Sequence, residues 1–402
     1  MTALHSTHIQ PLPHIGPVHI PRVLRVACVV AVLIGAATFF WSLGHDPARA
    51  WHNYLLNYFY WLCLGLGGAV FVAIQYLTGS VWSVGLRRTA EALVAYLPLG
   101  ALLFGGLVVG GSQLYDWTNP TYVAAHAVVA KKAAYLNWSA FATRHLLTLM
   151  IWIACALYFV RNSLRQDRTK EAALTQRNTK MAAGFMIVFA LSFTLACFDL
   201  LMSLDATWFS TIFGVYGFAG LFLSTIAMMT ILAVPLYRGG HFGPYVRAND
   251  HLFDLGKLMF AFTVFWAYIA FSQFMLIWYA DLPEETGYMI QRMSGHWLPV
   301  AWALLIFKFI LPFLLLLSQD WKKRPGFLFF MALWVLAAHY LDIYWLVFPH
   351  YSMQTPIFGW SEIGVFCGFA GMFGLCITGF LSRVSAVPIG DPRLHEAVEF
   401  HQ

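Results

Sequence analysis

The sequence predicts an all-α integral membrane protein with about ten transmembrane helices, and three observations support this fold class. Of its 402 residues, 60% are hydrophobic and only 10% are charged, whereas an ordinary soluble domain has roughly 25% charged residues. Ten stretches are apolar over about the 20 residues that a helix needs to cross a bilayer core. The 24 lysine and arginine residues lie mainly in alternate connections between these stretches. They form no dense basic face, so the sequence does not predict nucleic-acid binding.

The apolar stretches follow one another along the whole chain. The first 21 residues are polar, and the apolar run after them is too long for the core of a signal peptide, so we expect a retained first helix. This gives an N-terminal segment 1–21, a transmembrane domain 22–383 and a tail 384–402. The predicted spans are 22–43, 54–78, 89–114, 138–160, 181–203, 208–236, 255–279, 297–318, 326–347 and 361–382.

The cations predict the orientation of the chain, because loops on the cytoplasmic side carry most of the lysine and arginine. If the amino terminus is cytoplasmic, 18 of the 24 cations lie on the cytoplasmic side and 4 on the outer side. Arg144 and Lys308 lie inside predicted helices. We therefore expect both termini of this multi-pass membrane protein in the cytoplasm.

Two outer connections are longer than a turn. Residues 115–137 contain the alternating segment AAHAVVAKKAAYL (124–136), which is typical of a short interfacial helix. Residues 281–296 carry three carboxylates and a single arginine, Arg292, and predict an acidic outer surface.

Several kinds of chemistry have no signature in the sequence. Only His145 and His339 lie well inside predicted spans, on distant helices, so the chain is not expected to bind a haem by itself. It shows no P-loop, dinucleotide fingerprint or acidic metal cluster, and its six cysteines fall inside helices without metal-binding spacing. We expect this chain to bind no cofactor of its own, no metal, and to have no catalytic residue acting alone.

Ionisable residues within spans are costly and therefore point to function. Arg144 and His145 lie about 10 Å below the outer start of their helix, at the depth of Asp199 near the end of the next helix and Asp205 in the following hairpin. One hypothesis is a site where Arg144, His145 and Asp199 bind a quinol head group. His145 would accept its proton, and Asp199 or Asp205 would be the next station. The alternative is that Arg144 and Asp199 pair simply to neutralise each other between packed helices.

A second set of ionisable residues lies deeper. His339 and Asp342 are three residues apart on one helical face, where they form either a proton relay or a packing contact. Lys308 falls near the middle of its helix and needs an acidic partner, for which Asp342 or Asp199 is the first candidate. The predicted proton pathway therefore comprises His145, Asp199, Asp205, Lys308, His339 and Asp342.

Three segments carry a resemblance to a known family. They are KKAAYLN (131–137), FDLLMSLDATWFSTIFGVYGFAG (198–220) and FAFTVFWAYIAFSQFMLIWYADLPEETGYM (260–289). Together they resemble the polysulfide-reductase or NrfD-type membrane subunits of bacterial Alternative Complex III, with the second of its two such subunits as the nearest match. The similarity extends over essentially the whole chain.

The resemblance implies a role in quinol oxidation by a multi-subunit complex. It implies two four-helix bundles, formed by predicted helices 2–5 and 6–9, with helices 1 and 10 at the periphery. The implied partners are a homologous NrfD-like subunit, an iron–sulfur subunit and c-type cytochromes, which hold the iron–sulfur clusters and haem c. The implied substrate is menaquinol or ubiquinol. This chain would then contribute to proton release or translocation and to assembly.

Two other functions are compatible with the same sequence. The chain could be a self-sufficient secondary transporter, although transporters often have helices broken at the membrane midplane and the predicted helices here are continuous. It could also be a purely structural anchor for cytochrome and iron–sulfur subunits.

Overall fold

The computed structural model describes residues 15–399 and confirms the all-α integral membrane fold. In this part of the chain ten helical segments are long and apolar enough to cross a membrane. They are α1 (Arg22–His45), α2 (Pro47–Leu77), α3 (Arg87–Val94) with α4 (Leu97–Leu114), α7 (Trp138–Thr169), α8 (Ala172–Leu200), α9 (Phe213–Arg238), α10 (Phe253–Ala280), α12 (Leu298–Leu304) with α13 (Leu311–Leu317), α15 (Pro325–Tyr351) and α16 (Trp360–Leu381). Residues 1–14 of the predicted N-terminal segment and 400–402 of the tail lie outside the described residues.

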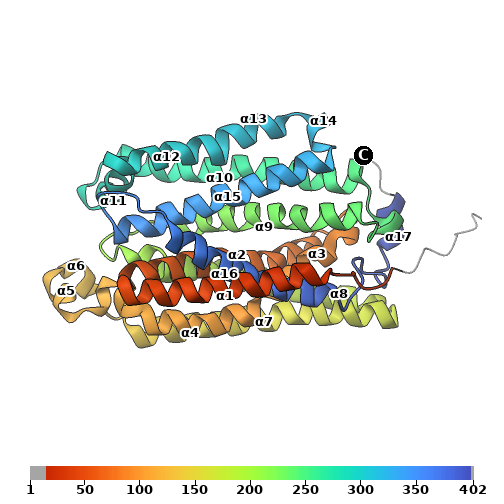
Figure 1. Ribbon diagram of the computed structural model, residues 1–402, viewed down its shortest axis with the longest axis horizontal. Coiled ribbons are helices and arrows are strands. Elements are labelled where there is room, and N and C mark those ends of the chain that lie inside the picture. The colour runs from red at the N-terminus through yellow and green to blue at the C-terminus, as the bar shows by residue number, and fades with distance from the viewer. Residues whose placement is uncertain (1–14, 400–402) are drawn as a thin grey trace, which may run out of the picture.

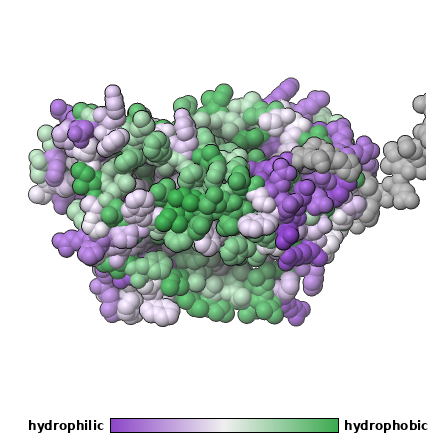
Figure 2. All heavy atoms as spheres, turned by 90° about the horizontal axis from the view of Figure 1, so that it is seen from above, coloured by the Kyte–Doolittle hydropathy of each residue, from purple (hydrophilic) through white to green (hydrophobic). Residues whose placement is uncertain are grey.

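The spans lie side by side along the long axis of the molecule (Figure 1). Both described chain ends lie at one end of the bundle, here called the terminal end, where the short helices α14 (Gln319–Lys322) and α17 (Leu394–Glu399) are also found. The far end carries α5 (Pro120–Ala125), α6 (Ala127–Lys131) and α11 (Pro283–Met293). Apolar side chains cover the middle of the face in Figure 2 and polar ones gather toward its two ends, as expected of a protein that spans a bilayer.

Several helix boundaries differ from the predicted ones for local reasons. α2 begins seven residues early, because Pro47 suits the first turn and the Asp46 side chain accepts a hydrogen bond from the Arg49 amide at 3.0 Å. α7 continues past its apolar stretch to Lys170, which ends it in the left-handed conformation at φ 55°. The predicted interfacial helix is divided in two at His126, which has an extended backbone.

The helices pack as two groups of four around a shared centre. α2, α3 with α4, α7 and α8 form the first bundle, and α9, α10, α12 with α13, and α15 form the second. α2 is buried along its transmembrane window and contacts both bundles. α1 and α16 pair at the periphery, where the backbones of Gly35 and Gly368 meet so closely that neither position has room for a Cβ atom.

Buried ion pairs fasten the tail to the terminal end of the first bundle. Arg87 forms an ion pair with Asp391 of the tail at 2.7 Å, and Arg88 pairs with both Glu91 and Asp167. Asp167 in turn accepts a hydrogen bond from the backbone amide of Gly390 at 3.1 Å. Since both arginines are almost fully buried, each needs these carboxylates to remain charged in the fold.

Candidate functional site

Four ionisable or hydroxyl side chains meet in the interior of the second bundle. Nζ of Lys308 forms an ion pair with Oδ2 of Asp342 and donates to Nδ1 of His339 at 3.1 Å. The hydroxyl of Tyr216 donates to the other carboxylate oxygen of Asp342. We call Tyr216, Lys308, His339 and Asp342 the buried cluster, because each of them is at most 5% exposed.

The cluster is assembled from α9, which carries Tyr216, from α15, and from the turn between α12 and α13. Lys308 lies in a π-helical turn, Leu305–Ile310, that joins α12 to α13 without breaking the span. Such turns are rare and are often found at functional sites. His339 and Asp342 lie one turn apart on α15, which places both side chains on the face toward Lys308, as predicted. The indole of Trp266 on α10 closes the cluster, with Nζ of Lys308 4.3 Å from the ring centroid.

The cluster can both hold and pass a proton. Lysine, carboxylate, imidazole and phenol all donate or accept protons, and here each is within hydrogen-bond reach of the next. The remaining ring nitrogen of His339, Nε2, is buried and has no hydrogen-bond partner among the described residues. The ring of Tyr60 on α2 lies beside this imidazole, with centroids 5.6 Å apart. The hydrogen-bonded chain therefore ends at a ring nitrogen of His339 that has no partner among the described residues.

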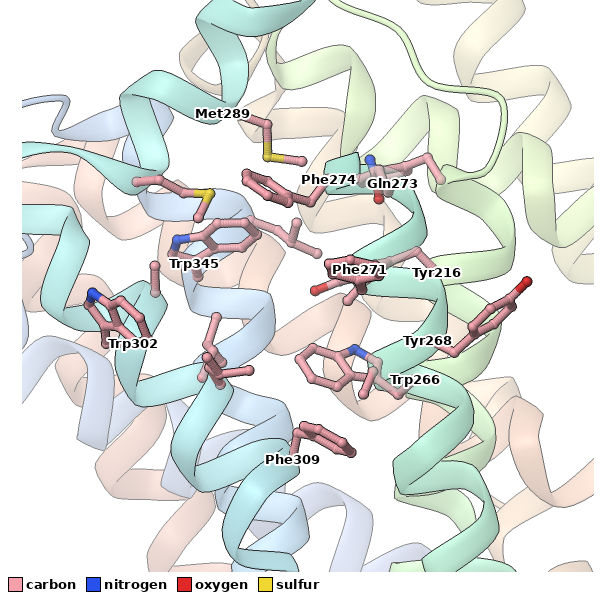
Figure 3. A pocket seen from close by; sticks show the side chains of 18 of the residues that line it. Tyr216, Trp266, Tyr268, Phe271, Gln273, Phe274, Met289, Trp302, Phe309 and Trp345 are labelled. Carbon is pink, nitrogen blue, oxygen red and sulfur yellow. The ribbon is translucent and has the colours of Figure 1, made fainter. Parts of the chain in front are cut away.

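An apolar cavity of about 610 Å³ adjoins the cluster. It lies between α10 on one side and α12 and α15 on the other, and Figure 3 shows Trp266 and Gln273 across from Trp302 and Trp345. Tyr216, a member of the buried cluster, and Trp266, which contacts Lys308, both line the cavity. The side chain of Tyr216 thus connects the cavity wall to Asp342.

The predicted site at Arg144, His145 and Asp199 divides into two separate parts. Arg144 pairs with Asp199 through two hydrogen bonds of 2.8 and 3.1 Å, which is the arrangement expected of mutual neutralisation. His145 points instead into the first bundle, where its Nε2 is hydrogen-bonded to the Tyr58 hydroxyl at 3.0 Å. Within residues 15–399, no hydrogen bond or ion pair joins His145 to Arg144 or Asp199. Neighbouring residues on a helix point about 100° apart, so similar depth did not bring them together.

Asp205 lies in the turn before α9, at the far end. It accepts a hydrogen bond from Thr207 at 2.7 Å, and its backbone carbonyl accepts from the Trp208 amide. The Trp208 indole stacks on the ring of Tyr288 with centroids 3.7 Å apart. Tyr288 also lines the cavity, so the Asp205 turn adjoins the far-end side of that cavity.

Arg292 is buried behind the same tyrosine. Its guanidinium lies 3.5 Å from the centroid of the Tyr288 ring and donates to the carbonyls of Tyr288 and Leu346. Burial lowers the pKa of Arg292, while the charge of Asp205 and the Tyr288 side chain oppose this change. Burial also raises the pKa of the Tyr288 phenol to about 12, with Arg292 acting in the opposite direction. Arg292 was counted among the cations of the outer connections, but α11 folds it inward, and the residue is buried.

Sequence reasoning did not find Tyr216, Trp266, Tyr60 or the cavity. Tyr216 is an ordinary aromatic residue of an apolar span, and only the packing of α9 against α15 brings its hydroxyl to Asp342. Its place inside the segment 198–220 that carries the family resemblance is the one signal that could have singled it out. The partner of Lys308, in contrast, was among the two predicted.

No described group of three or more histidine, cysteine, aspartate and glutamate side chains could hold a metal ion. A scan against models of known protein families matches none, and a search of curated proteins finds no relative. The fold and the site therefore establish only the class of protein. It is an all-α, multi-pass integral membrane protein with an ionisable cluster buried in its second helix bundle.

Proposed function

We propose that this protein is a membrane subunit of a quinol-oxidising electron-transfer complex of the Alternative Complex III type, in a bacterial inner membrane. Within that complex it transfers protons through its second bundle and helps to hold the assembly together. The observation that carries the proposal is the buried cluster of Tyr216, Lys308, His339 and Asp342. Iron–sulfur clusters and haem c belong to partner subunits, so this chain needs no electron carrier of its own.

The depth of the cluster supports a functional role. Lys308 lies 13 residues into the span Gly295–Leu317, which corresponds to about 20 Å along a helix. Insertion scales put a charged residue at the centre of a membrane helix at about 2.5 to 3.5 kcal/mol. A chain that needed only packing at this position would avoid this cost with an apolar side chain. Proton transfer explains why a lysine and an aspartate are both present.

The surroundings supply polar groups on both sides of the cluster. Toward the terminal end, Thr263 lies one turn from Trp266 on the buried face of α10, and Asp254 lies at the beginning of that helix. Toward the far end, Tyr216 and Tyr288 line the cavity that leads to the Asp205 turn. A proton path through the second bundle would therefore use the terminal part of α10, the cluster and the cavity wall in that order.

Two of the three segments that resemble the family also meet at this place. Residues 198–220 form the end of α8, the Asp205 turn and the start of α9, which carries Tyr216. Residues 260–289 form most of α10 and the start of α11, and they contribute Trp266, Gln273 and Tyr288. These residues lie around the cluster and its cavity. This coincidence favours proton transfer over a purely structural anchor.

The test is proton movement by the purified complex in sealed vesicles. Asp342→Asn and Lys308→Met are expected to lower the number of protons moved per quinol oxidised, because each removes a group that exchanges protons. Asp281→Asn is the matched control, since Asp281 lies outside the spans in a left-handed conformation that asparagine tolerates. Unchanged proton stoichiometry in both cluster variants would overturn the proposal. Purification of the chain as an active transporter without haem-bearing partners would favour the transporter alternative.

A further inference from the structure

The cavity beside the buried cluster opens toward the lipid side of the molecule. Several of its lining residues are also exposed on the outer surface of the bundle, among them Phe271 at 61% and Trp302 at 56%. Phe271 belongs to α10 and Trp302 to α12, so the opening lies between these two helices. A molecule dissolved in the membrane can therefore enter from the side, without passing through water.

The walls of the cavity favour a flat ring. Trp266, Phe274, Phe309, Trp302 and Trp345 are distributed around it on three helices (Figure 3). Aromatic side chains stack well on planar partners, with centroids about 4.5 to 7 Å apart. The volume of about 610 Å³ lies within the range of ordinary small-molecule sites, about 300 to 1,000 Å³.

Two polar groups of the wall, the indole nitrogen of Trp266 and the amide of Gln273, have no hydrogen-bond partner within the described part of the chain. Gln273 lines the cavity and is only 4% exposed, and within residues 15–399 its side-chain amide makes no hydrogen bond. A buried amide without a hydrogen bond costs about 1 to 3 kcal/mol, so a ligand atom that pairs with it gains affinity. The hydroxyl of Tyr216 also belongs to the wall and connects the cavity to Asp342.

The cavity has no charged lining residue, and this favours a neutral membrane molecule as its ligand. None of its lining residues is lysine, arginine, histidine, aspartate or glutamate. A phospholipid head group carries a phosphate and would lack a cation here, whereas a neutral ring with oxygen substituents needs only hydrogen bonds. We infer that the cavity binds the head group of a lipid-soluble quinol, with the amide of Gln273 hydrogen-bonded to one ring oxygen and the apolar tail leaving between α10 and α12.

This inference rests on the proposed function and names its ligand site. It locates quinol in the second bundle, beside Asp342, and not at Arg144, His145 and Asp199, where Arg144 and Asp199 already satisfy each other. The test uses the full purified chain in detergent with a short-tailed menaquinone that carries a photoreactive azide. After illumination, peptide mass spectrometry locates the attached label.

The expected label lies on residues of α10, α11 or α12 that line the cavity. Ala267→Trp fills the cavity and should weaken menaquinone binding more than tenfold, whereas Gln273→Leu should weaken it about five- to tenfold through one lost hydrogen bond. Ala190→Trp is the matched control, because Ala190 lies on the exposed surface of α8 in the first bundle.

Three results would overturn the inference. The label could attach to α7 or α8 near Arg144, Ala267→Trp could bind menaquinone as well as Ala190→Trp, or native mass spectrometry could find only phospholipid in the cavity. The proposed function is tested separately, since Asp342→Asn reports on proton movement. A protein that moves protons through Asp342 but binds no menaquinone in this cavity would retain the proposed function and lose the quinol site.

Discussion

Lys308 and Asp342 form a buried ion pair that joins the π-helical turn between α12 and α13 to the middle of α15. The lysine side chain is 0% exposed and the carboxylate 2% exposed. Both members have further partners, since His339 accepts from Lys308 and Tyr216 donates to Asp342. A change at either residue therefore leaves a charge without its partner in the most apolar part of the protein.

This dependence predicts different outcomes for single and double substitutions. Lys308→Met should lower the free energy of unfolding by about 3 to 5 kcal/mol, because it leaves Asp342 buried without its counter-ion. Lys308→Met combined with Asp342→Leu should recover most of that loss, because no charge is then left unpaired. The number of protons moved per quinol oxidised should be lower in both variants. The measurements are unfolding in mixed detergent and proton movement by the complex in vesicles.

The double variant separates stability from function. If it is as stable as the wild type and still moves protons, the pair serves packing alone. If it unfolds as easily as the single variant, the apolar replacements do not fit the site, and Asp342→Asn provides the functional comparison.

The Arg144 and Asp199 pair should behave differently. Arg144 is 25% exposed in its side chain and also stacks on the Tyr135 ring at 3.9 Å, so it keeps contacts when the carboxylate is neutralised. Asp199→Asn is expected to lower the free energy of unfolding by about 1 kcal/mol and to leave quinol binding unchanged. Thermal unfolding and menaquinone titration measure the two effects. A tenfold loss of menaquinone affinity in Asp199→Asn would instead indicate that the quinol site lies between α7 and α8.

The tail should contribute to stability through a single carboxylate. Asp391→Asn removes the nearer of the two carboxylates that pair with Arg87, at 2.7 Å against 3.5 Å for Glu91, and Arg87 is only 2% exposed. We expect a loss of about 3 kcal/mol in the free energy of unfolding. Glu396→Gln, on the exposed side of α17, is the matched control and should change it little. Equal stability of the two variants would show that the tail does not fasten the first bundle.

The raised pKa of Tyr288 predicts that the free energy of unfolding falls at alkaline pH. Its pKa is raised to about 12 in the fold, against 10.0 for a free phenol, so the folded state favours the neutral form. The fold keeps this contribution below pH 10 and loses it as the pH rises toward 12, by about 2 to 3 kcal/mol in total. Tyr288→Phe retains the stacking on Trp208 and should resist this loss. Unfolding at pH 8 and pH 11 tests it, and equal losses in both proteins would contradict the prediction.

The sequence determined the features that follow from composition along a single helix. Ten spans, with boundaries within several residues, could be predicted because each helix must satisfy its own backbone and present an apolar surface to lipid. The pairing of His339 with Asp342 could also be predicted, because three residues make one turn of the same helix. Lys308 and Arg144 were singled out because a charge in an apolar span is rare.

Only the tertiary structure decided how the helices face one another. The rotation of α7 about its axis turned His145 toward Tyr58 and left Arg144 with Asp199, although both positions have the same depth. The packing of α9 and α10 brought Tyr216, Trp266 and Gln273 around one cavity. Such contacts depend on the relative rotation and crossing of several helices. A run of uniformly apolar residues carries little information about these, because lipid and neighbouring helices offer nearly the same surroundings.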